Sequence, residues 1–255
     1  MNARWTKYIE RSAMRGLPWY LCVPVLVVMT GCDPDDPVAP DPNPPGGGQV
    51  YTPTPYTLTY PSYFSPMPIP ANNPLTEEGI RLGRFLLYEE RLSGDNTQSC
   101  ASCHGSAVAF TDHGNRFSTG IDGIQGTRNA MALQNLGWET SFFWDGRAAT
   151  LEEQILMPVM DPIEMHEEWP DALAKLQADP VYPTLFLRAF GTPGITQERT
   201  AKAIAQFLRT MVSSNSKYDR MVRGEELFTV EEQFGFELTT YEGGLPPDVP
   251  MGQGG

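Results

Sequence analysis

Two cysteines and a histidine lie close together in the stretch QSCASCH, as Cys100, Cys103 and His104. The chain has 255 residues and four cysteines, and the other two, Cys22 and Cys32, lie in or beside an N-terminal apolar segment. Thiols and an imidazole at this spacing bind a metal, form a disulfide or attach a cofactor, and each use demands a different surrounding structure. This cluster therefore constrains the fold more than any other feature of the sequence.

Three uses of the cluster compete. A structural zinc site needs about four ligands, whereas His113 and His166 each stand alone, without a second Cys or His pair. A thioredoxin-like redox pair belongs in a βαβ context, which the sequence does not show. The third use fits better, because C-x-x-C-H is the attachment signature of c-type haem. We predict one covalent haem c, bonded through Cys100 and Cys103, with His104 binding the iron.

The N-terminus has the pattern of a bacterial export signal. Residues 1–15 carry scattered positive charge, and LPWYLCVPVLVVMTGC is apolar but too short and too interrupted by proline for a membrane span. Its end, MTGC, resembles the lipoprotein box, so residues 1–31 are predicted to be a signal peptide and Cys32 the lipidated N-terminus. The alternative is ordinary signal cleavage with Cys32 incidental. Export agrees with haem attachment, which bacteria carry out outside the cytoplasm.

Residues 32–72 contain stretches such as DPDDPVAPDPNPPGGG. This composition buries too little apolar area to order itself, which predicts a disordered tether. Such a tether would hold a domain on the periplasmic side of a membrane. The formal net charge of -13 argues against nucleic acid as a partner, and would attract a small cationic electron carrier.

From residue 73 onward helix signals dominate, strand alternation is scarce, and the predicted fold is all-α with long loops. Thr76 is a predicted N-cap, and a later helix is expected to stop before Pro158. Capping boxes pair Thr150 with Glu153 and Thr229 with Glu232. The side chains expected to face the core are Ile80, Phe85, Leu86, Ile204, Phe207, Leu208 and Met211. Between Gly105 and Gly126 the sequence is glycine-rich and polar, which indicates a loop.

From about Leu75 onward the chain resembles the bacterial dihaem cytochrome c peroxidases and the related methylamine-utilisation haem enzyme. The stretches that match, in order, are LGRFLLYEERLSGDNTQSCASCH, FTDHGNRFSTGIDGIQGTRNA, FFWDGRAATLEEQILMPVMDPIEM, YPTLFLRAFG and AIAQFLRTMVSSNSKYDRMVRGE. FWDGRA and EM, at their spacing from CxxCH, are far more specific than CxxCH alone. The resemblance implies a cytochrome-c-like haem domain over residues 73–228, which is the family's N-terminal, peroxidatic half. It also implies that residues 229–255 begin a second domain that is truncated here.

The resemblance also assigns roles to single residues. His104 is the proximal iron ligand, and Glu164 is the acid/base carboxylate, although in the acidic stretch EMHEEW it would otherwise be read as a solvated charge. Trp144 matches an indole between the two haems, on an electron route, although a lone tryptophan is more often a core residue. Asn129 matches a ligand of a calcium ion whose other protein ligands come from the second domain.

The chain departs from the family pattern in two places. In many members a histidine in the glycine-rich loop binds the resting iron, but Ile121 occupies that position and cannot do so. We therefore expect a high-spin haem that needs no activation, with His113 either a substitute ligand or simply solvated. The family also continues into a second CxxCH, and none precedes Gly255. The chain is either a fragment of a longer protein or a one-haem protein with a separate reductant.

The resemblance implies reduction of hydrogen peroxide to water by a homodimer, with electrons drawn from a small cytochrome c or a cupredoxin through a second haem absent from this chain. One alternative is a single-haem electron carrier without peroxide turnover. Its sixth iron ligand would be Met131, Met157, Met160 or Met165. The other alternative is oxidation of a partner protein's aromatic side chains, as by the methylamine-utilisation relative.

Overall fold

The computed structural model describes residues 51–240, which belong to a single unit of the chain. Its α-helices are α1 (Glu77–Leu87), α2 (Cys100–Cys103), α3 (Leu151–Met160), α4 (Trp169–Ala178), α5 (Tyr182–Phe190), α6 (Gln197–Arg209), α7 (Lys217–Val222) and α8 (Val230–Thr240). Short 3-10 helices occur at η1 (Glu90–Leu92), η2 (Ser106–Val108) and η3 (Leu136–Trp138). Within residues 51–240 the β structure is confined to isolated bridges. The all-α prediction is confirmed for this part of the chain.

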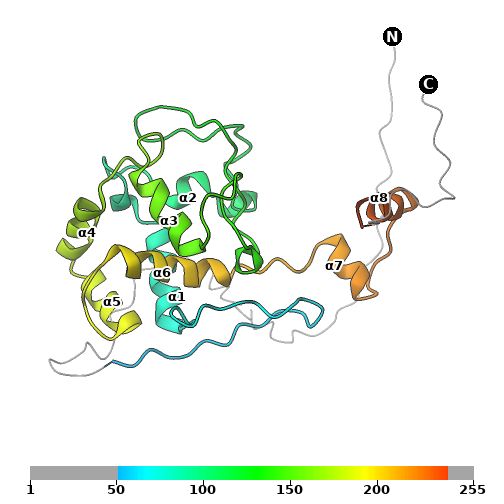
Figure 1. Ribbon diagram of the computed structural model, residues 1–255, viewed down its shortest axis with the longest axis horizontal. Coiled ribbons are helices and arrows are strands. Elements are labelled where there is room, and N and C mark those ends of the chain that lie inside the picture. The colour runs from blue at the N-terminus through cyan, green and yellow to red at the C-terminus, as the bar shows by residue number, and fades with distance from the viewer. Residues whose placement is uncertain (1–50, 241–255) are drawn as a thin grey trace, which may run out of the picture. The chain divides into compact units, whose positions relative to one another are not determined.

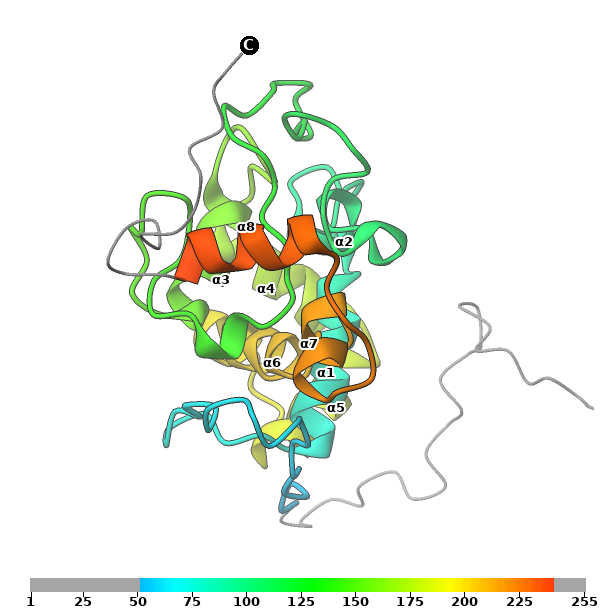
Figure 2. The same ribbon diagram turned by 90° about the vertical axis from the view of Figure 1, so that its right-hand side faces the viewer.

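Helices α1, α3, α5 and α6 build the core. Helix α6 packs against α1 and α3, and α1 also packs against α5, an arrangement that can be followed in Figures 1 and 2. Leu86, Phe186 and Ile204 are among the largest fully enclosed side chains. Gly83 allows the close crossing of α1 and α6, because a Cβ there would lie 1.9 Å from the carbonyl oxygen of Ala203.

The helix starts follow the cap signals in the sequence. Thr76 Oγ1 accepts a hydrogen bond from the Gly79 amide at 3.1 Å, and Thr150 Oγ1 accepts one from the Glu153 amide at 3.1 Å. The capping box of Thr229 and Glu232 is complete, since the Thr229 amide donates to Glu232 at 2.8 Å and the Glu232 amide donates to Thr229 at 3.3 Å. The Thr76 cap and this box are confirmed. The box of Thr150 and Glu153 forms only in part, because the Glu153 carboxylate accepts from the Ala149 amide at 2.9 Å rather than from the Thr150 amide.

Two predictions about the helices are wrong in detail. Helix α3 does not stop before Pro158 but contains it in its last turn and ends at Met160. A proline in the last turn removes only the amide that would donate to the Gln154 carbonyl. The carbonyls of Pro158 and Val159, left without helical donors because the helix ends, accept from the amides of Met165 and Glu167. On α1, Ile80 is only half-buried and is not part of the core, whereas Phe85 is half-buried but packs against the core, and Leu82 and Leu87 are buried.

Residues 51–72, which the composition assigned to the tether, lie against the helices. The Thr54 amide donates to Glu78 on α1 at 2.8 Å, and the Trp138 indole donates to the Ser65 carbonyl at 2.8 Å. The rings of Tyr60 and Trp138 meet edge to face with centroids 5.2 Å apart. Aromatic side chains therefore supply apolar contacts that hold this segment against the helices. The tether remains a prediction for residues 32–50, which lie outside the described residues together with Cys32 and the predicted signal peptide.

The loops that join α2 to α3 gather beside α2 in both views (Figures 1 and 2). They contain three of the residues predicted to form the site, His104, Asn129 and Trp144. Among residues 51–240, no helix is long and apolar enough to cross a membrane.

Candidate haem site

The two thiols of the CxxCH motif lie on the single-turn helix α2 (Cys100–Cys103). The Ser99 amide donates to Ser102 Oγ at 3.0 Å, and the His104 amide donates to the Cys100 carbonyl at 3.0 Å. Both cysteines are free thiols, and Cys100 packs against the hydrophobic core. Helix α2 therefore presents two thiols that are not joined in a disulfide, with His104 directly after them.

His104 is held in one orientation by its own loop. Its Nδ1 lies 3.0 Å from the carbonyl oxygen of Phe110, and because a carbonyl only accepts, Nδ1 carries the proton and Nε2 is left as the metal-binding nitrogen. Burial lowers the pKa of His104, although the carbonyls of Phe110 and Met131 and the charge of Asp112 oppose this shift. The neutral imidazole, which is the form that binds iron, is therefore favoured.

The surroundings of the two thiols do not supply a zinc site. Burial raises the pKa of Cys100 to about 12, and burial followed by the charge of Asp112 raises the pKa of Cys103. A structural zinc site needs about four ligands, and no cluster of three or more His, Cys, Asp or Glu residues that could hold a metal occurs within residues 51–240. Two neutral thiols beside a histidine with a free Nε2 fit a covalently attached haem c.

The loop after His104 is tightly folded. Ala109, Phe110 and His113 all have positive φ, at 58°, 55° and 47°, which is uncommon for residues with a side chain. Gly105 admits the His113 ring, because a Cβ on Gly105 would lie 2.4 Å from His113 Cε1. His113 is exposed. Its ring lies against Gly105, the residue that directly follows the CxxCH motif.

Glu164 lies on a tight turn after α3. The Ile163 amide donates to Asp161 Oδ1 at 2.8 Å, and the Glu164 amide donates to the Asp161 carbonyl at 2.9 Å. The Glu164 side chain reaches solvent, but the protein packed around it still disfavours its charge. This desolvation raises the pKa of Glu164, the charge of Asp161 adds to the rise, and Arg147 opposes it.

The structure brings Glu164 to the haem-attachment motif. Its charge contributes to the raised pKa of both Cys100 and Cys103. Ile121 is beside it as well, since its amide donates to the Glu164 carbonyl at 3.0 Å. The fold therefore assembles the CxxCH helix, the glycine-rich loop and Glu164 into one site.

Trp144 and Asn129 are neighbours at the surface. The Trp144 indole donates to the Asn129 backbone carbonyl at 2.8 Å, and the Asn129 side-chain amide donates to the Arg116 carbonyl at 2.7 Å. Trp144 is 63% exposed, so it is not a core residue, and Phe142 is the aromatic residue of this stretch that is buried. The roles of Trp144 in electron transfer and of Asn129 in calcium binding remain predictions.

Sequence reasoning missed several residues of this region. Arg147 lies over the Phe143 ring, 3.4 Å from its centroid, and pairs with Asp145 at 3.0 Å. The Gln98 amide nitrogen lies 3.5 Å from Cys103 Sγ and donates to the Thr119 carbonyl at 2.9 Å. Arg147 belongs to FWDGRA and Gln98 lies two residues before CASCH, so the motifs themselves were the available signal.

The methionines proposed for a sixth iron ligand are scattered. Met165 is buried in the core, whereas Met160 is 45% exposed. Met157 is half-buried against the core, and the Met131 carbonyl is close enough to His104 to affect its pKa. Met165 would have to leave the core to bind iron, and Met131 lies next to the proximal histidine.

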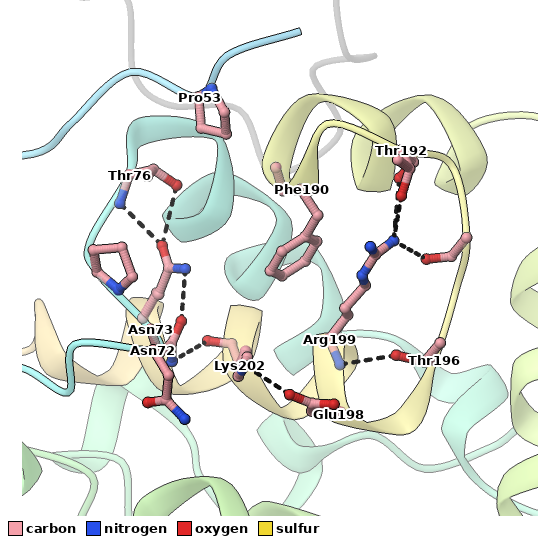
Figure 3. Close-up of a pocket in the computed structure, with 14 residues that line it drawn as sticks. Pro53, Asn72, Asn73, Thr76, Phe190, Thr192, Thr196, Glu198, Arg199 and Lys202 are labelled. Carbon is pink, nitrogen blue, oxygen red and sulfur yellow. Dashed lines mark hydrogen bonds and ion pairs between the residues drawn. The ribbon is translucent and has the colours of Figure 1, made fainter. Parts of the chain in front are cut away.

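A separate cavity of about 690 Å³ opens beside the start of α6 (Figure 3). Its charged groups are engaged with the protein, since Arg199 Nη1 donates to Thr192 Oγ1 at 2.7 Å and Lys202 pairs with Glu198 at 2.6 Å. It contains none of the predicted site residues. This cavity is therefore separate from the CxxCH site.

Comparisons with known proteins identify the family of the chain. The family model described as di-haem cytochrome c peroxidase matches residues 77–227. The methylamine utilization protein MauG of Methylophilus methylotrophus is 36% identical over 63% of this chain and 48% of its own length. The cytochrome c peroxidase Ccp of Escherichia coli K12 is 38% identical over 67% of this chain and 37% of its own length.

A solved structure gives the same result for the fold. The crystal structure of a MauG-like protein associated with microbial copper homeostasis is 36% identical, with a TM-score of 0.66 over 72% of this chain and 55% of that one. The chain thus spans about half the length of the relatives it matches. It is a member of the dihaem cytochrome c peroxidase family.

Proposed function

We propose that this chain carries the peroxidatic haem of a c-type peroxidase, which reduces hydrogen peroxide to water: H2O2 + 2 e⁻ + 2 H⁺ → 2 H2O. The observation that carries the proposal is the placement of Glu164. Its carboxyl has a raised pKa, and it is near enough to the attachment thiols to raise their pKa values. A proton-accepting group is thus near the two thiols, and the His104 that follows them has Nε2 available to iron.

Glu164 would move a proton between the two oxygens of peroxide. Reduction of peroxide requires one oxygen to lose a proton and the other to leave as water. A carboxylate beside the reacting oxygens can accept the first proton and return it to the departing oxygen, and a raised pKa suits both steps. The bound haem would supply the electrons that break the O–O bond.

Electrons would reach this site from outside the chain. We assign the exposed Trp144 to the electron route, with a small cytochrome c or a cupredoxin as donor, acting through a second haem. The formal charge of -13 would attract a basic donor. Lipidation of Cys32 would hold the protein on the periplasmic side of the membrane. Asn129 would bind calcium together with residues outside the described part of the chain.

Oxidation of a partner protein is a second candidate. It is favoured by the 63% exposure of Trp144, which allows electron exchange with a docked protein, and by similarity to proteins named MauG. A plain electron carrier is less consistent with a carboxyl of raised pKa in the site.

The proposal is tested with the full-length, haem-loaded protein and its Glu164→Gln variant. We expect the second-order rate constant for reaction with hydrogen peroxide to fall by about a hundredfold or more, because the amide cannot accept the proton. The matched control is Glu168→Gln, an exposed glutamate at the start of α4 whose side chain makes no cap hydrogen bond. An unchanged rate in Glu164→Gln would rule out this role for Glu164.

A further inference from the structure

Residues 118–126 form a loop that is closed by hydrogen bonds between its own backbone groups. The Gly120 amide donates to the Ile124 carbonyl at 3.0 Å, and the Gly126 amide donates to the Ser118 carbonyl at 2.9 Å. The tip turns at Gly123, where φ is +72°. We call this segment the distal loop, and its internal bonds let it move as one piece.

The distal loop is attached to the turn that carries Glu164. The Ile121 amide donates to the Glu164 carbonyl at 3.0 Å. Gly120 is needed for this approach, because a Cβ there would lie 2.0 Å from the Ile163 carbonyl oxygen. From the other side, the Gly94 amide donates to the Met165 carbonyl at 2.9 Å. The backbone on either side of the Glu164 side chain is therefore positioned by neighbouring segments.

One side-chain pair joins the same two segments. His166 Nδ1 lies 2.6 Å from Asp122 Oδ2, across 44 positions of sequence. The two side chains are 54% and 46% exposed, and exposed pairs contribute little to stability. His166 also has a φ of +45°, an uncommon conformation for a residue with a side chain, and its exposure means that burial does not hold it there.

We propose that Asp122 and His166 are positioning residues for Glu164, and this inference rests on the proposed role of Glu164 in proton transfer. The pair fastens the tip of the distal loop to the residue two positions after Glu164. Together with the bond from the Ile121 amide, it fixes the turn at two points, the carbonyl of Glu164 and the side chain of His166. Without it the loop and the turn can separate, and small displacements of a reacting group cost large factors in rate.

The key variant is Asp122→Ala in the full-length, haem-loaded protein. We expect its rate constant with hydrogen peroxide to fall about tenfold, with the melting temperature close to that of the unaltered protein. Asp122→Asn keeps an oxygen that accepts from Nδ1, so its rate should be largely restored. The matched control is Glu198→Ala, which removes an exposed 2.6 Å pair with Lys202 on α6 and should leave the rate unchanged.

The decisive comparison uses the Glu164→Gln background. If Asp122 acts through Glu164, Asp122→Ala adds no further loss once the carboxyl is gone. An equal further loss in that background would overturn the proposal, because the pair would then act on something else. If Asp122→Ala does not fold, His166→Gly serves instead, since it removes the imidazole and relieves the positive φ, and the same loss is expected.

The same variants distinguish a failure of the positioning role from a failure of the proposed function. A normal rate in Asp122→Ala beside a slow Glu164→Gln would overturn the positioning role and leave the proposed function intact. A normal rate in Glu164→Gln would overturn the proposed function, and the positioning role with it.

Discussion

The helical scaffold and the loops around the CxxCH motif are built by different kinds of residue. In the scaffold, caps start the helices, and side chains such as Leu86 and Phe186 are fully enclosed. In the loops, segments approach closely at glycines: Gly105 leaves room for the His113 ring and Gly120 for the Ile163 carbonyl. Several loop residues that have a side chain also adopt positive φ. The non-glycine residues with positive φ within the described chain are Asn96, Ala109, Phe110, His113, Asn135, Phe143 and His166. None of them belongs to α1, α5 or α6, so stability and site geometry can be altered separately.

The largest effect on stability is expected from Leu86→Ala in the scaffold. Leu86 is 0% exposed on α1, in the cluster shared with α6, and removing a buried leucine side chain usually costs about 2–5 kcal/mol in the free energy of unfolding. Urea denaturation followed by circular dichroism measures the loss. Leu227→Ala is the control, because Leu227 is 84% exposed. If the two variants were equally stable, the helices would not be the main source of stability.

A smaller loss of stability but a clear functional loss is expected from Gly120→Ala in the distal loop. The added Cβ would lie 2.0 Å from a backbone oxygen, so the loop must shift, at a cost of about 1–3 kcal/mol. Because that oxygen belongs to Ile163, next to Glu164, the rate with peroxide should fall as well. Both quantities are measured on the same preparation, by denaturation and by stopped-flow absorbance.

Gly126→Ala is the matched control in the same loop. The nearest atom to its added Cβ would be 3.7 Å away, an ordinary contact, so neither stability nor rate should change. Equal effects at Gly120 and Gly126 would mean that close approach to the Glu164 turn does not matter.

The helical scaffold and the loops also differ in how well the sequence predicted them. Thr76, Thr150 and Thr229 could be identified as helix starts because a cap signal is local, contained within four residues. Pro158 was misjudged because the groups that satisfy the end of α3 come from the following turn, beyond the helix. The packed segment 51–72 was assigned to the tether because its aromatic contacts, such as Tyr60 with Trp138, are long-range.

The site was predictable where a motif names its chemistry. Cys100, Cys103 and His104 follow from a spacing that has few other uses, and Glu164 and Trp144 came from the family resemblance. The pairing of Asp122 with His166 and the contact of Arg147 with Phe143 could not be derived. Such contacts depend on where whole loops lie, and no periodicity or cap encodes that.

A modest effect is expected from Thr150→Ala at the start of α3. Its hydroxyl accepts from the Glu153 amide at 3.1 Å, and losing such a cap costs about 1 kcal/mol. Because α3 packs on α6 and leads into the Glu164 turn, this variant asks whether scaffold damage reaches the site. We expect a lower melting temperature and an unchanged rate with peroxide, and Thr150→Ser should recover the stability. A slower reaction would show that the two regions are coupled through α3.

The smallest effect, and one of opposite sign, is expected in the stability of Glu164→Gln. Desolvation raises the pKa of Glu164 above its usual 4.5, so between these two values the folded protein binds more protons than the unfolded chain, and stability falls as pH rises through that window. Above it the cost of the charge is fully present, and a neutral glutamine avoids it. We therefore expect the variant to melt slightly higher than the unaltered protein at pH 7, with the difference vanishing below about pH 4. The gain should be small because the side chain reaches solvent and Arg147 compensates in part.

Destabilisation of Glu164→Gln at pH 7 would mean that the fold favours the carboxylate. A gain in stability beside a large loss of rate would instead identify Glu164 as a group retained for its chemistry, at the expense of the scaffold that holds it.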